Sequence, residues 1–452
     1  MDTAAAEDGA DAAAPAASAA APPAGPPAVV IDSGAYSTKV GFAGQDAPTR
    51  CMPSVVAREG ERRKYVGDAV SQCADPSGLA FRRPCEKGYV MNWDVTQELW
   101  DRAFGAEVLG LDAAAIGERA LLVTEPQFNH EPLQDTMDQL VFELYGFKEY
   151  HCTTAAMLSD VAHRHTAAGA DALASVVVDA GYSFTHAVPI FDATKVNYAV
   201  KRVDVGGKIL TNYLAELCQH REYNLMDETY LVDQLKQVMC YVSGNFDADM
   251  KAARVRGKGN TIRRHFVLPD YRAKNHGYVR GDSSRVWNDA RATQPDPELR
   301  GPEQEITLNI ERFTAPELLF NPSDIGFEQG GVVDAIEQAI NALPVDLREP
   351  AVGNVLLTGG NALIPGFADR VERELRAILP DTLSPLLKVH LLESTQPLGC
   401  GDGGRAHAAW RGGSILAASA DFSRMTVTKE EYEEYGHRLC RLRNLQPGSA
   451  AA

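Results

Sequence analysis

Two Asp-x-Gly motifs have the residue types and the setting of a phosphate-binding site. Asp32 and Gly34 form one motif, Asp179 and Gly181 form the other, and each follows a short run of β-branched residues. Glycine lets backbone N–H groups approach a phosphate closely, and each aspartate could hold Mg²⁺ through water. One motif alone is weak evidence, because most such triplets are ordinary turns. Two copies after similar strands indicate a shared site.

Other residues could extend this site toward a whole nucleotide. Lys39 follows the first motif and would bring a point charge to the β- and γ-phosphates. The Gly359-Gly360 pair ends a third apolar run, Val355–Leu357, and paired glycines would let a flat base lie against the backbone. The alternative for this third element is a plain turn between a strand and a helix.

The repeated motif predicts how the chain is organised. A strand followed by Asp-x-Gly occurs twice, far apart, which favours two lobes of related build whose turns face one cleft. The chain has 452 residues, whereas single cores stop growing near about 250 to 300 residues. We therefore expect an α/β fold of two lobes. Amphipathic segments such as Pro132–Tyr145 supply helices, and Glu431–His437 is expected to form a last helical turn.

Composition limits the class of protein. Hydrophobic residues make up 45% and charged residues 23% of the chain, as in soluble globular proteins. The net charge of −17 argues against broad coating by nucleic acid, so any DNA contact must be local. The eight cysteines lack the paired spacing of a zinc site and are expected to be reduced thiols of an intracellular protein. We expect no membrane contact.

The expected boundaries follow the same patterns. Residues 1–28 are rich in Ala and Pro and contain no Lys or Arg, so we expect a disordered tail and no targeting peptide. The first lobe is expected over 29–172 and the second over 173–430. A charged insertion with many Gly and Pro is expected at about 251–305, and a C-terminal segment over 400–445 is expected to return toward the first lobe.

Several segments together resemble actin. They are IDSGAYSTKVGFAGQDAP (Ile31–Pro48), DAGYSFTHAVPI (Asp179–Ile190), LLTGGNALIPGFADR (Leu356–Arg370) and WRGGSILA (Trp410–Ala417). Their order and spacing are those of the actin family. The resemblance implies an actin-like fold of the actin/Hsp70/hexokinase type, with two duplicated lobes around a nucleotide cleft. Residue by residue, it implies that ATP, where bound, contacts Asp32, Ser33, Gly34, Lys39, Asp179, Gly181, Lys236, Gly359, Gly360 and Asn361.

Further segments are similar to one nuclear branch of that family, the actin-related protein 6 family. They are KGYVMNWD (Lys87–Asp94), MDET (Met226–Thr229), FNPSDIG (Phe320–Gly326) and EEYEEYGH (Glu430–His437). The similarity implies a protein of the nucleus, partly cytoplasmic, that is a subunit of a SWR/SRCAP-type remodeller. Such a complex exchanges a core histone for its variant. Implied partners are a Snf-type ATPase and a zinc-HIT subunit, with the histone variant and nucleosomal DNA reached through the complex.

The sequence departs from a hydrolysing actin at the phosphate loops. Ala35 and Tyr36 stand where actins have a serine and a glycine, and Tyr182 and Ser183 stand where they have an acidic residue and a glycine. Mg²⁺ prefers carboxylates, so the cation site is weakened. Ala155 stands at the position of the glutamine that orients water, and alanine cannot do this.

The rest of the site is mixed. Gln237, Asn361, Ile364 and Ala406 replace residues that usually line the nucleotide, and a lone His186 is more often structural than catalytic. We therefore expect no catalytic residue, no metal of the chain's own, and nucleotide binding without efficient hydrolysis. The equally weighted alternative is that the retained glycines and aspartates only hold the lobes together.

Two surface segments carry the remaining expectations. Ala57–Lys64 is charged where actins have a hydrophobic loop, so a filament contact would be costly and we expect no homopolymer. A basic stretch could touch nucleosomal DNA through phosphates, although a solvated loop is the favoured alternative. Its candidate residues are Lys251, Arg254, Arg256, Lys258, Arg263 and Arg264. A partner could also order Tyr271–Glu305, with Tyr278 and Trp287 as anchors.

Two other functions fit the same fold. A nucleotide-hydrolysing enzyme would keep acidic residues at both phosphate loops, and Tyr182 and Ala155 argue against it. A filament-forming actin would keep the hydrophobic loop, and Ala57–Lys64 argues against that.

Overall fold

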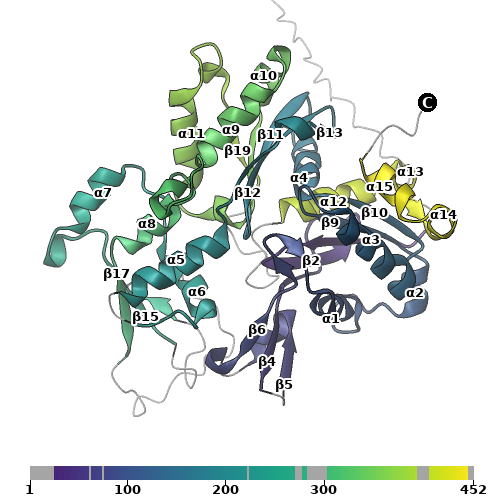
Figure 1. The fold of residues 1–452 in the computed structure, drawn as a ribbon, viewed down its shortest axis with the longest axis horizontal. Coiled ribbons are helices and arrows are strands. Elements are labelled where there is room, and N and C mark those ends of the chain that lie inside the picture. The colour runs from purple at the N-terminus through teal and green to yellow at the C-terminus, as the bar shows by residue number, and fades with distance from the viewer. Residues whose placement is uncertain are drawn as a thin grey trace, which may run out of the picture.

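The computed structural model describes residues 25–60, 63–73, 76–220, 223–269, 277–281, 303–393 and 407–445. Its centre is formed by two six-stranded sheets, one in each lobe (Figure 1). The first sheet contains, in spatial order, β20 (Val427–Thr428), β10 (Glu149–Thr154), β9 (Ala120–Glu125), β1 (Val29–Ser33), β2 (Ser37–Phe42) and β3 (Arg50–Pro53). The second contains β13 (Thr194–Lys195), β12 (Thr185–Phe191), β11 (Ala174–Ala180), β18 (Val355–Thr358) and β19 (Val389–Leu391), with β14 (Lys201–Val203) paired to β12.

The two sheets share one pattern of pairing. In the first, β1 is antiparallel to β2 and parallel to β9; in the second, β11 is antiparallel to β12 and parallel to β18. Asp32 therefore faces Lys39 across one hairpin, and Asp179 faces His186 across the other. The predicted α/β fold of two duplicated lobes is confirmed.

Helices cover both sheets. Those of the first lobe are α1 (Trp93–Phe104), α2 (Ala113–Gly117), α3 (Glu131–Gln139), α4 (Ala155–Arg164), α12 (Ala408–Ala417), α13 (Phe422–Met425), α14 (Lys429–Tyr435) and α15 (His437–Leu445). Those of the second lobe are α5 (Gly207–Gln219), α6 (Thr229–Met239), α7 (Phe246–Ala253), α8 (Glu311–Glu317), α9 (Val332–Ala342), α10 (Val345–Val352) and α11 (Phe367–Ile378). The predicted helix over Pro132–Tyr145 is α3 followed by a π-helix, Leu140–Tyr145. No described helix is long and apolar enough to cross a membrane.

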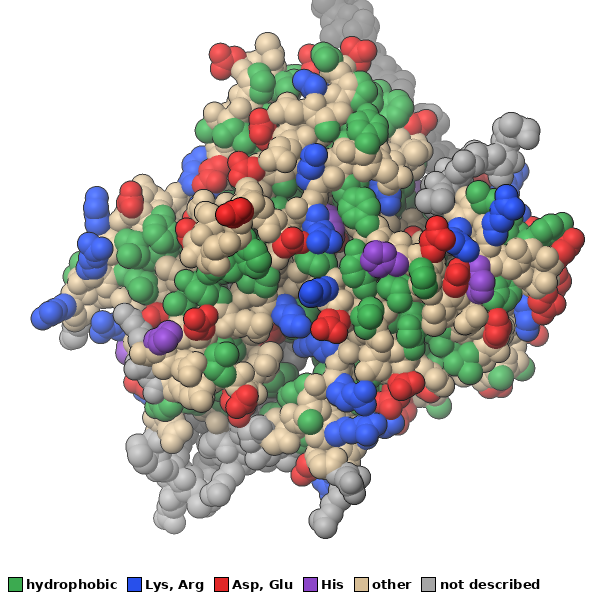
Figure 2. All heavy atoms as spheres, in the orientation of Figure 1, with side chains coloured by type: hydrophobic (Ala, Val, Ile, Leu, Met, Phe, Trp, Pro, Cys, Tyr) green, Lys and Arg blue, Asp and Glu red, His purple; other side chains and the backbone are tan. Residues whose placement is uncertain are grey.

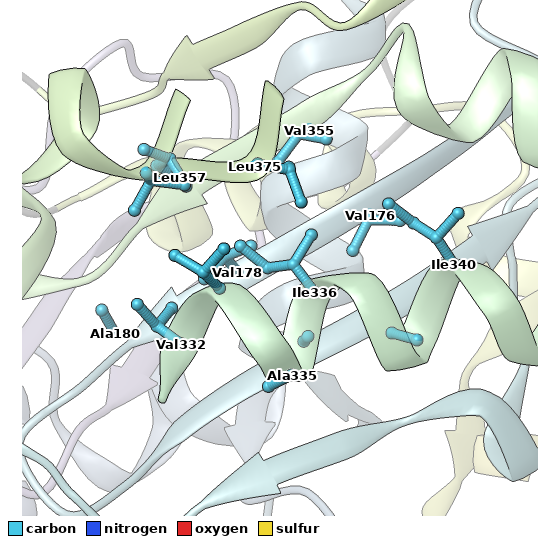
Figure 3. Packing of buried hydrophobic residues seen from close by; sticks show 14 of the residues in the cluster. Val176, Val178, Ala180, Val332, Ala335, Ile336, Ile340, Val355, Leu357 and Leu375 are labelled. Atoms are coloured by element: carbon cyan, nitrogen blue, oxygen red, sulfur yellow. The ribbon is translucent and has the colours of Figure 1, made fainter. Parts of the chain in front are cut away.

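Each lobe has its own hydrophobic core. In the second lobe, Ile336 and Ile340 of α9 pack on Val176 and Val178 of β11 and on Leu357 of β18 (Figure 3). All of these side chains are buried, and burying each one stabilises the lobe by about 1.5 to 3 kcal/mol. A corresponding aromatic core lies in the first lobe, around Trp100, Phe142 and Phe147. The strand ends that carry Asp32 and Asp179 are therefore fixed from both sides of the cleft.

Helix α12 packs unusually closely against α4. A Cβ atom on Gly412 would lie 1.7 Å from the carbonyl oxygen of Leu158, so only glycine fits at this helix crossing. Trp410 lies at the start of the same helix, and its indole N–H donates to the carbonyl oxygen of Val30 on β1 at 3.0 Å. The WRGGSILA segment thus fastens α12 to α4 and to the strand that leads into the first Asp-x-Gly turn.

The last described segment, which ends with α15, lies against the first lobe. Strand β20 pairs with β10, and α15 packs beside α3 although the two helices are far apart in sequence (Figure 1). His437 Nδ1 lies 3.1 Å from a carboxylate oxygen of Asp138, which joins α15 to α3. The expected last helical turn, Glu431–His437, is divided between α14 and the start of α15.

The range expected as an exposed insertion is partly built into the second lobe. Strands β15 (Arg264–Val267), β16 (Tyr278–Val279) and β17 (Glu305–Leu308) form a three-stranded sheet, and Phe266 within it is fully buried. Tyr278 donates to Glu303 at 3.1 Å, whereas Trp287 lies outside the described residues. The described part of this range is therefore partly exposed and partly packed into the second lobe, and the expected extent of the insertion stays a prediction.

The segment expected to replace the hydrophobic loop of actins is a hairpin. It consists of β4 (Val56–Glu59) and β5 (Arg63–Val66), with β6 (Ala80–Arg82) on the other side of β4. Nearby, β7 (Cys85–Glu86) pairs with β8 (Tyr89–Val90). The cysteines that the structure describes form no disulfide with one another, and Cys400 and the Ala/Pro-rich residues 1–24 lie outside the described part.

Gly412→Ala is expected to lower the free energy of unfolding by about 3 kcal/mol, because the added methyl group must push α12 away from α4. Chemical denaturation measures the change. Gly78→Ala is the matched control, since nothing lies within 4 Å of its Cβ position and its effect should stay within about 0.5 kcal/mol. Equal losses for the two variants would contradict the close packing.

Candidate nucleotide cleft

Two adjacent cavities lie where the two Asp-x-Gly turns meet, one of them about 290 Å³ in volume. That volume is at the small end of the range for small-molecule sites. The predicted nucleotide contacts that line this cavity are Asp32, Gly34, Lys39, Asp179, Gly181, Lys236, Gly359, Gly360 and Asn361, and Ser33 lines the neighbouring one. The structure thus brings all the predicted residues together. That they bind a nucleotide stays a prediction.

Backbone geometry explains the glycine at the end of β18. Gly359 has a φ of +89°, and a Cβ atom there would lie 2.5 Å from the carbonyl oxygen of Ala180. Gly359 is therefore required by the close approach of β18 and β11, whether or not a base is bound, whereas nothing lies within 4 Å of the Cβ position of Gly360.

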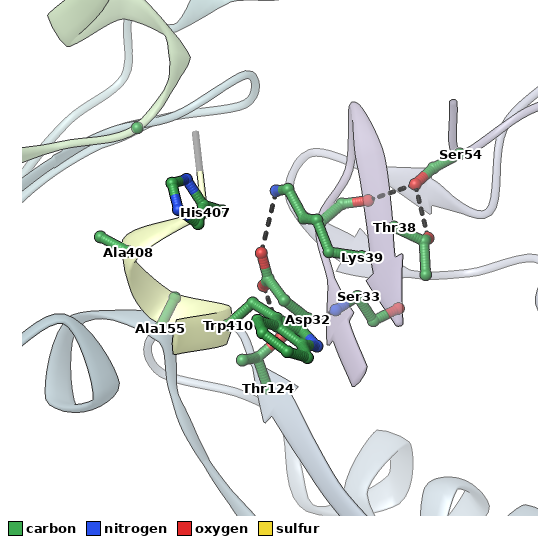
Figure 4. Close-up of polar contacts among 12 residues, drawn as sticks. Asp32, Ser33, Thr38, Lys39, Ser54, Thr124, Ala155, His407, Ala408 and Trp410 are labelled. Atoms are coloured by element: carbon green, nitrogen blue, oxygen red, sulfur yellow. Dashed lines mark hydrogen bonds and ion pairs between the residues drawn. The ribbon is translucent and has the colours of Figure 1, made fainter. Parts of the chain in front are cut away.

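In the first turn, Lys39 and Asp32 satisfy each other. The ammonium group of Lys39 donates to one oxygen of Asp32 at 2.9 Å, and Thr124 donates to the other oxygen at 2.9 Å (Figure 4). Burial alone would lower the pKa of Lys39, but the charge and hydrogen bond of Asp32 outweigh it and raise this pKa. Lys39 is therefore a paired cation and not a free one.

Asp179 is in a different state from Asp32. No hydrogen bond to its carboxylate is recorded among the described residues, and its nearest charged neighbours include Asp32 and Glu393. Burial, followed by the repulsion of these two carboxylates, raises the pKa of Asp179 to about 6. Among the described acids that line the larger cavity, Asp179 is the one with no recorded hydrogen bond or ion pair.

The second turn is closed by helix α5. The backbone N–H of Gly207 donates to the carbonyl oxygen of Gly181 at 3.1 Å, and that of Lys208 donates to Tyr182 at 2.8 Å. The side-chain amide of Asn361 also donates to the carbonyl oxygen of Gly181, at 2.7 Å. The first N–H groups of α5 are thus engaged by carbonyl oxygens, although a helix N-terminus is otherwise well suited to a phosphate.

Lys236 is also fully engaged. Its ammonium group donates to Asp233 at 2.7 Å, to the hydroxyl of Thr211 at 2.7 Å and to the carbonyl oxygen of Gly207 at 3.1 Å. Burial would raise the pKa of Asp233, but Lys236 and the hydrogen bonds from Tyr36 and Gln237 lower it. Asp233 is therefore ionised and well satisfied.

Tyr36 and Tyr182, which replace a glycine and an acidic residue of hydrolysing actins, make specific contacts. The hydroxyl of Tyr36 donates to Asp233 at 2.7 Å and accepts from the side-chain amide of Gln237 at 2.8 Å. The ring of Tyr36 also meets that of Tyr182, with 5.4 Å between ring centroids. The guanidinium of Arg83 lies 5.5 Å and 5.0 Å from these two ring centroids. Sequence reasoning did not predict these contacts.

Glu393 is a second residue that sequence reasoning missed. One of its oxygens accepts from Thr358 at 2.6 Å, and the other accepts from the backbone N–H of His407 at 2.7 Å. It thereby joins the end of β18 to the start of α12. In the sequence, Glu393 is distinguished only by following a short apolar strand. Many acidic residues on protein surfaces have the same position.

Ala155 and His186 lie beside the cleft without a catalytic arrangement. Ala155 lines both cavities and offers only a methyl group. Burial and the nearby Arg202 lower the pKa of His186 to about 4, so its ring is neutral near pH 7. Gln237 and Ile364 also line the larger cavity, and Ala406 lies outside the described residues.

The predicted basic residues lie together on α7 and the segment that follows it. Figure 2 shows Lys and Arg side chains gathered over α7 at the left edge. Described and exposed members are Lys251, Arg254, Arg256, Arg263 and Arg264, called the α7 patch below. None of them pairs with an acid within the described part of the chain, and the side chain of Lys258 is not described.

A family model described as Actin matches residues 25–444 of this chain. The chain belongs to the actin family. Its match covers the two sheets, both Asp-x-Gly turns and the C-terminal helices. Members of the actin family generally bind a nucleotide, which makes the cleft between the lobes the candidate nucleotide site.

Curated relatives place the chain within one branch of the actin family. It is 37% identical over 440 residues to "Actin-related protein 6" of Oryza sativa subsp. indica, covering 92% of this chain and 98% of that protein. The corresponding protein of Drosophila melanogaster is 35% identical over 413 residues, covering 90% and 97%. That of Arabidopsis thaliana is 35% identical over 435 residues, covering 92% and 98%. The predicted resemblance is confirmed at both levels.

Asp179→Asn is expected to stabilise this actin-family chain near pH 7 and to have little effect near pH 4. The folded state holds the proton of Asp179 more tightly than the unfolded state does, so stability falls as the pH rises from the usual value, 3.8, through about 6. The shift corresponds to about 3 kcal/mol. Urea denaturation at several pH values measures it.

Asp32→Asn is the matched control. It removes the partner of the buried Lys39 and should lower stability near pH 7 by about 3 kcal/mol. If the two variants changed stability in the same direction near pH 7, the difference between the two carboxylates would be refuted.

Proposed function

We propose that this chain is a non-hydrolysing structural subunit of a nuclear SWR/SRCAP-type remodeller, which exchanges a core histone for its variant. Its similarity to actin-related protein 6 of several organisms supports this assignment. In this proposal the chain helps to assemble the complex and to engage the nucleosome. Its partners are a Snf-type ATPase and a zinc-HIT subunit.

The observation that carries the proposal is the chemistry at the cleft. Ala155 cannot orient a water molecule for attack on a phosphate, and Tyr182 supplies no carboxylate for Mg²⁺. Both ammonium groups of the larger cavity, on Lys39 and Lys236, already bind carboxylates. Hydrolysis needs a positioned water and a neutralised phosphate, so the residues support at most slow turnover.

The β4–β5 hairpin supports a monomeric subunit over a filament. It presents charged side chains, among them Arg58, Arg63 and Lys64, and Ala57 is turned into the core beneath it. Burying these charges in a repeated contact between copies would cost more desolvation than it returns.

The α7 patch supports contact with nucleosomal DNA, because its backbone is held rigidly. Asn260 donates to the carbonyl oxygen of Ala253 at the end of α7 and accepts from the backbone N–H groups of Ile262 and Arg263. Phe246 of α7 packs on the buried Phe313. Because the backbone is already ordered, less conformational entropy is lost when its cationic side chains bind phosphates. This favours DNA contact over a solvated loop.

Purification of the tagged chain from nuclei tests the proposal. Recovery with a Snf-type ATPase and a zinc-HIT protein is expected. Recovery alone, or in a polymer that sediments, would overturn it. Phosphate release from ATP by the purified chain should not exceed the background rate, and rapid release would place the chain among the hydrolysing enzymes.

Reversing two charges of the α7 patch, with Arg263→Glu and Arg264→Glu, is expected to weaken nucleosome binding by the assembled complex. The slope of log affinity against log salt should become shallower by about 2, one for each lost phosphate contact. Binding is measured over a range of salt concentrations, and subunit assembly should stay intact.

Lys388→Glu with Arg438→Glu is the matched control, because it changes the charge equally at exposed residues of other elements: Lys388 directly precedes β19 and Arg438 belongs to α15. An equal loss of binding in the control would show that net charge, and not the α7 patch, is responsible.

A further inference from the structure

Tyr36 connects the two lobes across the larger cavity. It follows the first Asp-x-Gly turn on the first lobe, whereas its hydrogen-bond partners, Asp233 and Gln237, belong to α6 of the second lobe. Tyr36 and both partners line the cavity that also contains Lys236 and Asn361. A side chain of the protein thus occupies the route between the phosphate turn and the opposite wall.

We propose that Tyr36 is a built-in substitute for a nucleotide: it holds the cleft closed, and a nucleoside triphosphate can enter only when Tyr36 is displaced. Tyr36, Asp233 and Gln237, with the rings and guanidinium of Tyr182 and Arg83, are called the Tyr36 clasp. This inference does not depend on the chromatin role, because it concerns only how the two lobes are held.

The polar half of the clasp is strong for a contact between lobes. Asp233 is buried and ionised, and its second oxygen accepts from Tyr36 at 2.7 Å and from Gln237 at 2.8 Å. Hydrogen bonds to a buried charge are about twice as strong as neutral ones. Since Gln237 also donates to the hydroxyl of Tyr36, the three groups form a closed ring of hydrogen bonds.

The aromatic half fixes the direction of the Tyr36 side chain. Tyr182 extends from the second Asp-x-Gly turn and meets the Tyr36 ring at a tilt of 44°. Arg83 lies over both rings and brings a positive charge to them, a favourable arrangement between a cation and an aromatic face. The ring of Tyr182 lies close to Gly207, since a Cβ atom added to Gly207 would be 3.4 Å from that ring.

A second contact joins the first lobe to α6. Phe81 on β6 stacks on Tyr230 at the start of α6, with ring centroids 6.2 Å apart and planes 13° apart. Helix α6 is therefore held from the first lobe at two separate points, by Phe81 and by Tyr36.

The charge around the cavity favours Tyr36 over a polyphosphate. Four carboxylates line it, on Asp32, Asp179, Asp233 and Glu393, against the ammonium groups of Lys39 and Lys236. Both ammonium groups are already paired with carboxylates. A triphosphate would enter a region of net negative charge, whereas a neutral phenol does not meet this repulsion.

Hydrogen exchange of Tyr36→Phe tests the clasp. The variant keeps the ring and leaves Asp233 bound to Lys236, Thr211 and Gln237, so it should fold. Amide exchange over the hairpin Ser33–Lys39 and over α6 should become about tenfold faster than in the unmodified chain.

Tyr182→Phe is the matched control, since no hydrogen bond of the Tyr182 hydroxyl is recorded among the described residues, and its exchange over the same segments should change less than twofold. Equal exchange rates in Tyr36→Phe and the unmodified chain would overturn the proposal.

Tyr36→Gly tests the competition with nucleotide. In this variant, millimolar Mg·ATP should restore slow exchange over α6, whereas the same addition should leave exchange in the unmodified chain unchanged. Equal protection of both proteins by Mg·ATP would overturn the proposal, as would a lack of protection in Tyr36→Gly. Neither outcome would bear on copurification with a remodeller, so the two proposals fail independently.

Discussion

Four carboxyl groups converge where the two lobes meet, accompanied by only two ammonium groups, and each carboxyl must be satisfied or protonated. Asp32 accepts hydrogen bonds from Lys39 and Thr124, and Glu393 accepts hydrogen bonds from backbone N–H groups at the start of α12. Asp233 accepts hydrogen bonds from Lys236 and, across the cleft, from the hydroxyl of Tyr36. Asp179 is left without such a partner and has a raised pKa. The ways in which these four carboxyl groups are paired or protonated determine the arrangement of the cleft.

The same groups connect the fold to the proposed function. The ammonium groups of Lys39 and Lys236, which could otherwise bind phosphates, are paired with carboxylates of the protein. The first backbone N–H groups of α5 donate to carbonyl oxygens of the second Asp-x-Gly turn. These contacts hold the two lobes of the actin fold in a fixed orientation relative to each other. A fixed relation suits a subunit whose surfaces, such as the α7 patch, must be presented in constant positions.

The sequence predicted the features that depend on local pattern. Strands with Asp-x-Gly turns are recognisable because β-branched runs and glycines act over a few residues. Lys39 was predicted to contact phosphates, whereas the structure pairs it with Asp32 across one hairpin. The sequence could not predict that Tyr36 meets Asp233, since the two are 197 positions apart and only tertiary packing joins them. Likewise, the charged residues around Phe266 give no local signal that this side chain is buried in a three-stranded sheet.

The central claim is that side chains of the chain itself, and not a nucleotide, hold the two lobes together. Thermal unfolding of the purified chain, before and after removal of all nucleotide and divalent cations with apyrase and EDTA, tests this claim most directly. The account predicts melting temperatures that agree within about 1 °C. A fall of several degrees that Mg·ATP reverses would contradict it.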